Sequence, residues 1–159
     1  MQFQRTTDYE LVKRIVTDPS IYPFVADDLS PKPAEWQPVC HELIWYVLAV
    51  HEGESVGMLM LMPRNSIHFD CHVCMLQSGM GKALDTPNEF VSWVWENTPC
   101  RRMTASIPAF NRAAIRFALR GGMAEFGKNP DSFLKHGKLH PQILLGVTKA
   151  QGDGNGNRR

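Results

Sequence analysis

The stretch from Ile67 to Asn97, IHFDCHVCMLQSGMGKALDTPNEFVSWVWEN, decides the fold. Its first part alternates with a period of two, as in a β-strand: one face is Ile67, Phe69, Cys71, Val73 and Met75, and the other is His68, Asp70, His72 and Cys74. A glycine-bearing loop follows this strand. Thr86-Pro87-Asn88-Glu89 is then a Thr-x-x-Glu capping box with proline at the first helical position, which predicts a helix over residues 87–97.

The chain before this stretch predicts a strand, a helix and a hairpin. Residues 1–5 are expected to form the strand, and residues 7–16 the helix, with Asp8 as its N-cap. Four prolines make the next segment irregular, with room for one short helical turn between Ile21 and Asp27. Two apolar runs, residues 43–50 and 56–62, flank a turn that contains Gly53, and together they predict the hairpin.

The chain after this stretch predicts a strand over residues 100–107 and a helix over residues 111–120. Gly121-Gly122 is expected to stop this helix, and residues 143–148 to form a final strand. The order of elements indicates an α/β (α+β mixed) fold, in which helices cover a mixed sheet. We expect one domain over residues 1–149 and a disordered tail over residues 150–159, which lacks large apolar side chains.

Composition limits the classes of partner. With 17 Lys and Arg against 16 Asp and Glu, the net charge of +1 offers no broad field for nucleic acid or anionic lipid. The N-terminal residues carry charges where a signal peptide needs an apolar core, and no run is long enough to span a membrane. We therefore expect a cytoplasmic protein that binds neither nucleic acid nor membrane, with its four cysteines reduced and mostly packed.

The glycine-bearing loop is a candidate phosphate site. A strand that runs through such a loop into a capped helix presents unpaired backbone N–H groups to an anion. The same pattern also fits an ordinary strand-to-helix turn, because glycine is the default residue of tight turns. The candidate cofactor-binding residues here are Met75, Leu76, Gly79, Met80, Gly81, Lys82 and Ala83.

The cysteines of this strand suggest two further kinds of site, a zinc site and a cysteine nucleophile. Cys71 and Cys74 have a spacing used by zinc sites, but in an alternating strand they point to opposite faces, so we expect no metal. For the same reason Cys71 and the adjacent His72 do not form a nucleophile and its base. A stripe of Arg112, Arg116 and Arg120 fits either a solvated helix face or contacts with phosphates or an acidic partner.

Two motifs resemble those of the GNAT superfamily of N-acetyltransferases. The run Met80-Gly81-Lys82-Ala83-Leu84-Asp85 takes the place of the family's pyrophosphate loop, Arg/Gln-x-x-Gly-x-Gly/Ala, but departs from it at Met80, Ala83 and Asp85. An alignment on Gln77, Gly79 and Gly81 keeps the residue types and is one residue short. The second motif, Asn111-x-x-Ala114-x-x-Phe117-x-x-x-x-Gly122-Met123, is similar to the family's Asn-x-x-Ala helix. The resemblance covers about residues 47–126, and the general style also resembles GNAT-like proteins encoded by bacteriophages.

The resemblance implies a mixed, mostly antiparallel sheet flanked by helices, with acetyl-CoA as the acyl donor and Asn111 near it. It implies direct attack by an amine of a protein or a small molecule, with a base on the strand that carries Asp70, His68 and His72. These three residues equally fit a solvent-facing strand. Ser106 could hold a water or be an ordinary strand residue. The family's acid, a tyrosine, falls at Ala118, which favours the alternative that the chain is a catalytically degenerate binding or structural protein. A homodimer, or a phage or host protein partner, stays open.

Overall fold

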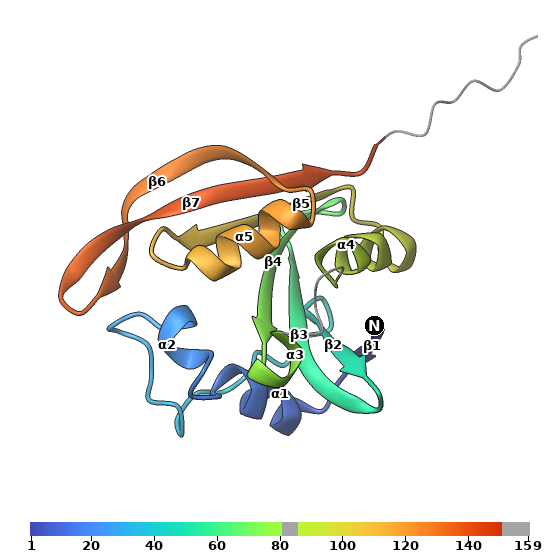
Figure 1. Ribbon diagram of the computed structural model, residues 1–159, viewed down its shortest axis with the longest axis horizontal. Helices are drawn as coiled ribbons and strands as arrows, with labels where there is room; N and C mark the ends of the chain where they lie inside the picture. Colours follow the sequence, from blue (N-terminus) through green and yellow to red (C-terminus); the bar gives the residue numbers. More distant parts are fainter. Residues whose placement is uncertain (81–85, 151–159) are drawn as a thin grey trace, which may run out of the picture.

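The computed structural model describes residues 1–80 and 86–150, in which seven strands form one sheet (Figure 1). The strand order is β1-β2-β3-β4-β5-β7-β6, and every neighbouring pair is antiparallel except β4 and β5, which are parallel. The strands are β1 (Gln2–Thr6), β2 (Trp45–His51), β3 (Glu54–Pro63), β4 (His68–Met75), β5 (Arg102–Pro108), β6 (Ala124–Lys135) and β7 (Lys138–Thr148). The expected mixed, mostly antiparallel sheet flanked by helices is confirmed.

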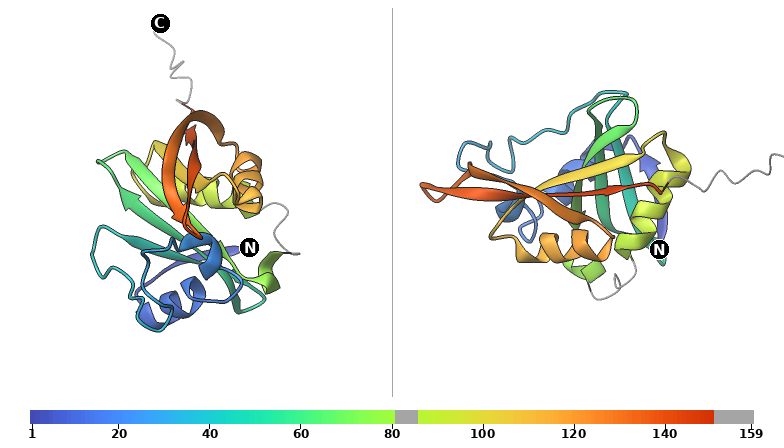
Figure 2. Two further views of the ribbon diagram at one scale, coloured as in Figure 1. Left: turned by 90° about the vertical axis from the view of Figure 1, so that its left-hand side faces the viewer. Right: turned by 90° about the horizontal axis from the view of Figure 1, so that it is seen from above.

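Helices cover both faces of the sheet (Figure 2). They are α1 (Tyr9–Val16), α2 (Tyr22–Val25), α3 (Gln77–Met80), α4 (Thr86–Asn97) and α5 (Arg112–Arg120). On one face, α1 and α2 pack on β2, β3 and β4 through a cluster that includes Val12, Tyr22 and Met58. On the other face, α4 and α5 pack through a second cluster that includes Val94, Ala118 and Leu145. Each face of the sheet therefore has its own hydrophobic core.

The predicted helix boundaries are confirmed to within about two residues. The Asp8 carboxylate accepts a hydrogen bond from the Leu11 N–H at 2.9 Å, and the Asn111 side chain accepts one from the Ala114 N–H at 3.1 Å. Both side chains thereby pair an N–H group that the first helical turn cannot satisfy itself. Gly121 ends α5, and Gly122 follows it with a φ of +81°.

Strand β4 has the two faces that its alternation predicts. Phe69 and Cys71 belong to the cluster under α4 and α5, whereas Cys74 belongs to the cluster under α1 and α2. Cys71 and Cys74 therefore lie on opposite faces of the sheet, as expected, and cannot close on one zinc ion. The four cysteines carry free thiols, and Cys40 is the exposed one.

The strands after α5 are longer than expected. The final strand begins at Lys138 and not at residue 143, and β6 has no counterpart among the predicted elements. β6 carries Gly127, Pro130 and mostly exposed side chains, and its pairing with β7 has two register shifts. Because these irregularities break the alternation of a regular strand, the local pattern hid β6, and pairing with β7 supplies its backbone partners.

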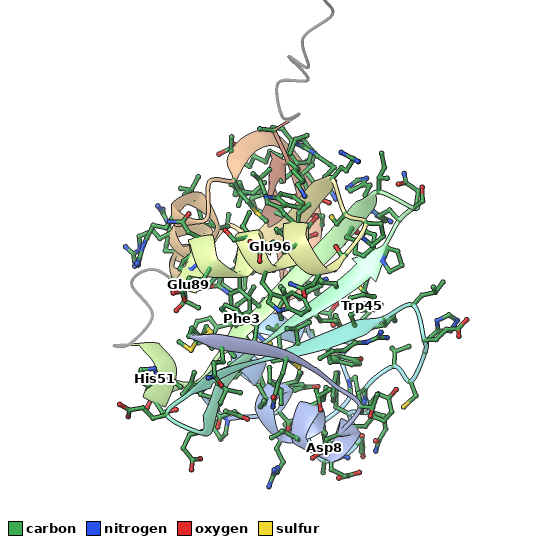
Figure 3. All side chains as sticks on the ribbon, turned by 90° about the vertical axis from the view of Figure 1, so that its right-hand side faces the viewer. Phe3, Asp8, Trp45, His51, Glu89 and Glu96 are labelled. Atoms are coloured by element: carbon green, nitrogen blue, oxygen red, sulfur yellow. The ribbon has the colours of Figure 1, made fainter. Side chains whose placement is uncertain are left out.

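The first strand packs beside α4 (Figure 3). The Phe3 and Phe90 rings lie 4.5 Å apart between their centroids, and the N-terminal ammonium lies 3.6 Å from the Glu89 carboxylate. All four tryptophans are half-buried and pack against the two clusters. Of the helices in residues 1–80 and 86–150, none is long and apolar enough to cross a membrane.

The turn between β6 and β7 is fastened to the segment after α2. The Asp28 carboxylate accepts hydrogen bonds from the N–H groups of His136 at 2.9 Å and Gly137 at 2.7 Å. The Asp28 N–H donates to the Leu134 carbonyl at 3.0 Å, and the Lys135 ammonium donates to the Ala26 carbonyl at 2.6 Å. These contacts join chain segments more than 100 residues apart and fix the hairpin over the α2 side of the molecule.

We expect Asp28→Ala to loosen this turn without unfolding the sheet. The amides of Gly137 and His136 lower the pKa of Asp28, so its contribution is complete above the ordinary value of 3.8 and is lost as the pH falls through the lowered pKa. At neutral pH, hydrogen exchange at the His136 and Gly137 amides should become faster in Asp28→Ala. The exposed β6 variant Glu125→Ala should leave both rates unchanged. Equal rates in all three proteins would contradict the assignment.

Candidate functional site

Strands β4 and β5 part after three paired residues. Their parallel pairing runs from His68 with Arg102 to Asp70 with Thr104, while β4 continues to Met75 and stays paired with β3. Figure 1 shows the two strands diverging beyond this point. We call the Asp70–Thr104 pair the junction and the diverging part the opening.

The backbone of β4 presents hydrogen-bonding groups to the opening. The Leu76 N–H donates to the Val56 carbonyl and the Arg64 N–H to the His68 carbonyl, so even-numbered residues of β4 are bonded to β3. By the alternation of an antiparallel pair, the N–H and C=O groups of Val73 and Met75 point the other way, toward β5. The described pairing with β5 does not reach them, because it ends at the junction. Among the described residues no strand pairs with them on this side, so they form a short strand edge.

A cavity lies where β4 ends. It measures about 540 Å³ and is lined by Leu76, Gln77 and Ser78 on one side, and by Asp18, Pro19 and Ser20 of the loop between α1 and α2 on the other. This volume is in the range of small-molecule sites, about 300–1,000 Å³. The Ser20 hydroxyl and N–H donate to Asp18 and lower its pKa, so this wall is anionic at neutral pH.

Gly79 is required by packing against the neighbouring strand β3. A Cβ atom at this position would lie 2.6 Å from the Val56 carbonyl oxygen, which belongs to the backbone of β3 and cannot move cheaply. Glycine therefore lets α3 sit directly against β3 at the end of β4. Met80 ends α3, and the predicted phosphate-loop residues Gly81, Lys82 and Ala83 lie outside the described residues.

Two of the three predicted catalytic residues of β4 belong to one hydrogen-bonded group. The Asp70 carboxylate accepts a hydrogen bond from the Thr104 hydroxyl and pairs with Arg64, whose Nε lies 2.7 Å from Oδ2. The Thr104 oxygen also lies 2.8 Å from Nε2 of His68. Sequence reasoning missed Arg64, in the turn after β3, and Thr104. The pattern of β5 places Thr104 and Ser106 on one face, but no local signal shows that Thr104 is buried next to Asp70.

His72 is the third of these residues and remains exposed to solvent at the start of the opening. The surrounding protein nevertheless removes part of the water around the imidazole, and this desolvation lowers its pKa. The negative charge of Asp70 acts in the opposite direction and offsets part of that effect. His72 is therefore neutral at pH 7, which leaves one ring nitrogen able to accept a proton.

The remaining predicted site residues have separate places. Ser106 is exposed on β5, beyond the junction. The Asn111 side chain caps α5, so its oxygen is already bonded to the Ala114 N–H. Ala118 is buried in the core under α5. The side chains of Arg112, Arg116 and Arg120 are exposed.

Comparison with known proteins gives matches at the level of structure alone. No family model matches the chain, and no curated protein does. The spermidine N-acetyltransferase from Vibrio cholerae, solved with CoA and spermine, superposes with a TM-score of 0.76 at 11% identity, over 93% of this chain and 95% of that chain. A GNAT-family acetyltransferase from Streptococcus pneumoniae gives a TM-score of 0.70 at 14% identity, over 94% and 99%.

The chain has the GNAT fold. A proposed acetyltransferase from Salmonella typhimurium, solved with acetyl-CoA, also matches, with a TM-score of 0.71 at 15% identity over 97% of this chain and 96% of that chain. The match extends beyond the region from about residue 47 to 126 on which the sequence resemblance rested. At these identities the likeness establishes the GNAT fold and leaves activity to be argued from the site.

Proposed function

We propose that the chain is an acetyl-CoA-dependent N-acetyltransferase, a single GNAT-like domain over residues 1–149 that acts in the cytoplasm. The observation that carries the proposal is the opening between β4 and β5, with a free strand edge that leads to a cavity. Neighbours of the same fold were solved with CoA or acetyl-CoA, and one is named for the amine spermidine. The acceptor is accordingly an amine of a protein or a small molecule.

The residues of the opening fit the proposed cofactor. Free backbone N–H and C=O groups at Val73 and Met75 suit an extended chain that carries amides, such as the pantetheine arm of CoA, which would add to the strand edge. When bound, acetyl-CoA supplies an activated acetyl thioester. Three of the predicted cofactor-binding residues lie in the described part of the chain, at the end of β4 and just after it. They are Met75, Leu76 and Gly79. Gly81, Lys82 and Ala83 lie outside the described residues and, with Met80, are kept as proposed cofactor-binding residues; Asn111 contributes by holding the first turn of α5.

His72 is the proposed general base. An amine reacts only as the neutral species, so the acceptor ammonium must first lose a proton. The neutral imidazole of His72 can accept that proton, whereas both oxygens of Asp70 are already paired with Arg64 and Thr104. Asp70 then acts through its negative charge, and His68 through its hydrogen bond with Thr104. Ser106 presents a hydroxyl beyond the junction and is the proposed holder of a water.

A second candidate function rests on Ala118. The resemblance puts the family's proton-donating tyrosine at this position, and here the methyl group is buried in the core under α5. A GNAT-fold protein without that acid could serve as a binding or structural module for a phage or host protein. A phage origin would agree with the sequence resemblance to phage-encoded GNAT-like proteins.

Calorimetric titration with acetyl-CoA separates the two functions. We expect micromolar binding to the wild type and at least about tenfold weaker binding to Ser78→Trp, because an indole would fill the cavity that is to hold the ligand. Ser78 is exposed, so folding should tolerate the change, and Ser92→Trp on the exposed face of α4 is the matched control. No binding at millimolar acetyl-CoA would exclude the enzyme and leave the binding module.

A further inference from the structure

Four polar side chains meet at the junction of β4 and β5. His68 and Asp70 come from β4, Thr104 from β5, and Arg64 from the turn after β3. Three contacts connect them in a row: His68 Nε2 to Thr104 Oγ1 at 2.8 Å, the Thr104 hydroxyl to Asp70 Oδ1, and Arg64 Nε to Asp70 Oδ2 at 2.7 Å. We call these four residues the junction network.

Counting protons fixes the direction of each hydrogen bond. An ionised carboxylate only accepts, so the single hydroxyl proton of Thr104 goes to Asp70. The Thr104 oxygen can then only accept from His68, whose Nε2 must carry a proton. The network therefore requires a proton on Nε2 of His68. Both oxygens of the Asp70 carboxylate have a partner, Oδ1 with the Thr104 hydroxyl and Oδ2 with Arg64.

The hydroxyl of Thr104 is not needed for packing. Thr104 is 7% exposed, and a valine at this position would have the same shape and need no hydrogen-bond partner. The group that threonine adds serves the contacts to Asp70 and His68 alone. Asp70 and Thr104 are the last paired residues before the strands part, and the next residue on that face of β4 is His72.

Asp70 is the ionisable neighbour that acts on His72 in the sheet. On β3, Met60 lies opposite His72 and Met62 opposite Asp70, and neither carries a charge. On β5 the same face presents Arg102, Thr104 and Ser106; the Arg102 guanidinium lies against the Thr148 hydroxyl and the Phe126 ring, and the other two side chains do not titrate. In the cluster that α1 and α2 pack on this face, Tyr22, Tyr46 and Cys74 stay neutral, because burial raises the pKa of both tyrosines and raises that of Cys74 to about 12.

We propose that Thr104 is a positioning residue for the acetyl transfer. Its hydroxyl holds the Asp70 carboxylate in place, and so fixes the position of this negative charge next to the proposed base, His72. The inference rests on the proposed function for its kinetic consequence. Its two structural consequences, the tautomer of His68 and the pKa of His72, do not depend on that function. If Thr104 only stabilised the junction, its substitution would change the free energy of unfolding and would leave the pKa of His72 unchanged.

The test compares Thr104→Val, which removes the hydroxyl at constant shape, with Thr104→Ser, which keeps it. In ¹⁵N NMR spectra, wild type and Thr104→Ser should show His68 in the Nε2–H form, and Thr104→Val should show a mixture of tautomers. The pKa of His72, followed in the same spectra, should move in Thr104→Val and return to the wild-type value in Thr104→Ser. For acetyl transfer we expect about a 10- to 100-fold lower kcat in Thr104→Val, with an unchanged KM for acetyl-CoA and rescue by serine.

The outcomes separate this inference from the proposed function. A folded Thr104→Val with an unchanged His72 titration would overturn the inference, whatever the activity. An unchanged kcat in Thr104→Val, in an active wild type, would also overturn it. A wild type without transferase activity would refute the proposed function, and the shift of the His72 titration with serine rescue would still support the positioning role.

Discussion

His72→Ala is expected to lower the kcat of acetyl transfer by about 10²- to 10⁴-fold, the usual contribution of a general base. The KM for acetyl-CoA should stay within about twofold, because the free edge of β4 that is to hold the donor is backbone and survives the substitution. His51→Ala is the matched control, since His51 lies at the end of β2, two strands away from β4. A steady-state comparison of the three proteins checks this prediction, and an active His72→Ala would place the base elsewhere.

The role of His72 as the base also predicts in which direction kcat changes with pH. The base works only when its imidazole is neutral, so kcat should fall as the pH drops through the pKa of His72. Because desolvation lowers that pKa, the fall should lie below pH 6.5, the ordinary value for histidine. Asp70→Asn removes the charge that raises the pKa of His72, so the acidic limb should move further down. An acidic limb that moves up in Asp70→Asn would contradict the assignment.

Leu145→Ala is expected to lower the free energy of unfolding by about 2–5 kcal/mol. Leu145 is fully buried on β7, opposite Ala105 of β5, in the core that α4 and α5 cover. Removal of the Leu145 side chain would leave a cavity under strands β5 to β7, and β5 is the side of the opening that lies across from β4. Leu139→Ala on the same strand is the control, because Leu139 is 59% exposed and should cost less than about 0.5 kcal/mol. Urea denaturation followed by circular dichroism measures both, and equal midpoints would contradict the placement of Leu145.

The two largest effects concern different halves of the molecule. His72 belongs to the sheet half formed by β1 to β4, and Leu145 to the half formed by β5 to β7, and the short parallel pairing of β4 with β5 joins them. The junction network lies at that pairing. A change there can therefore affect the chemistry through His72 and also the angle between the halves, which is why Thr104→Ser is needed beside Thr104→Val.

The sequence by itself determined the elements whose signals are local. Asp8 and Asn111 cap their helices with their own side chains, Gly53 and Gly122 take positive φ values at turns, and the alternation of β4 separates Cys71 from Cys74. Each of these follows from a few neighbouring residues, because caps, turns and pleats depend on short-range geometry. They were sufficient for the order of elements from β1 to α5, apart from the short helix α3, and for the resemblance to the GNAT fold.

The tertiary structure alone decided which residues meet. Nothing near Thr104 in the sequence places its hydroxyl between Asp70 and His68, and nothing near Asp28 places its carboxylate at the turn of His136 and Gly137. Strand β6 exists because β7 pairs with it, although its own residues do not alternate regularly. In the first two cases the physical reason is distance along the chain: the contacts join residues 34 to 109 positions apart, and only the folded sheet brings their hydrogen-bonding groups within reach. In the third case the partner strand is the next one in the chain, and the two register shifts are what removes the regular alternation from β6.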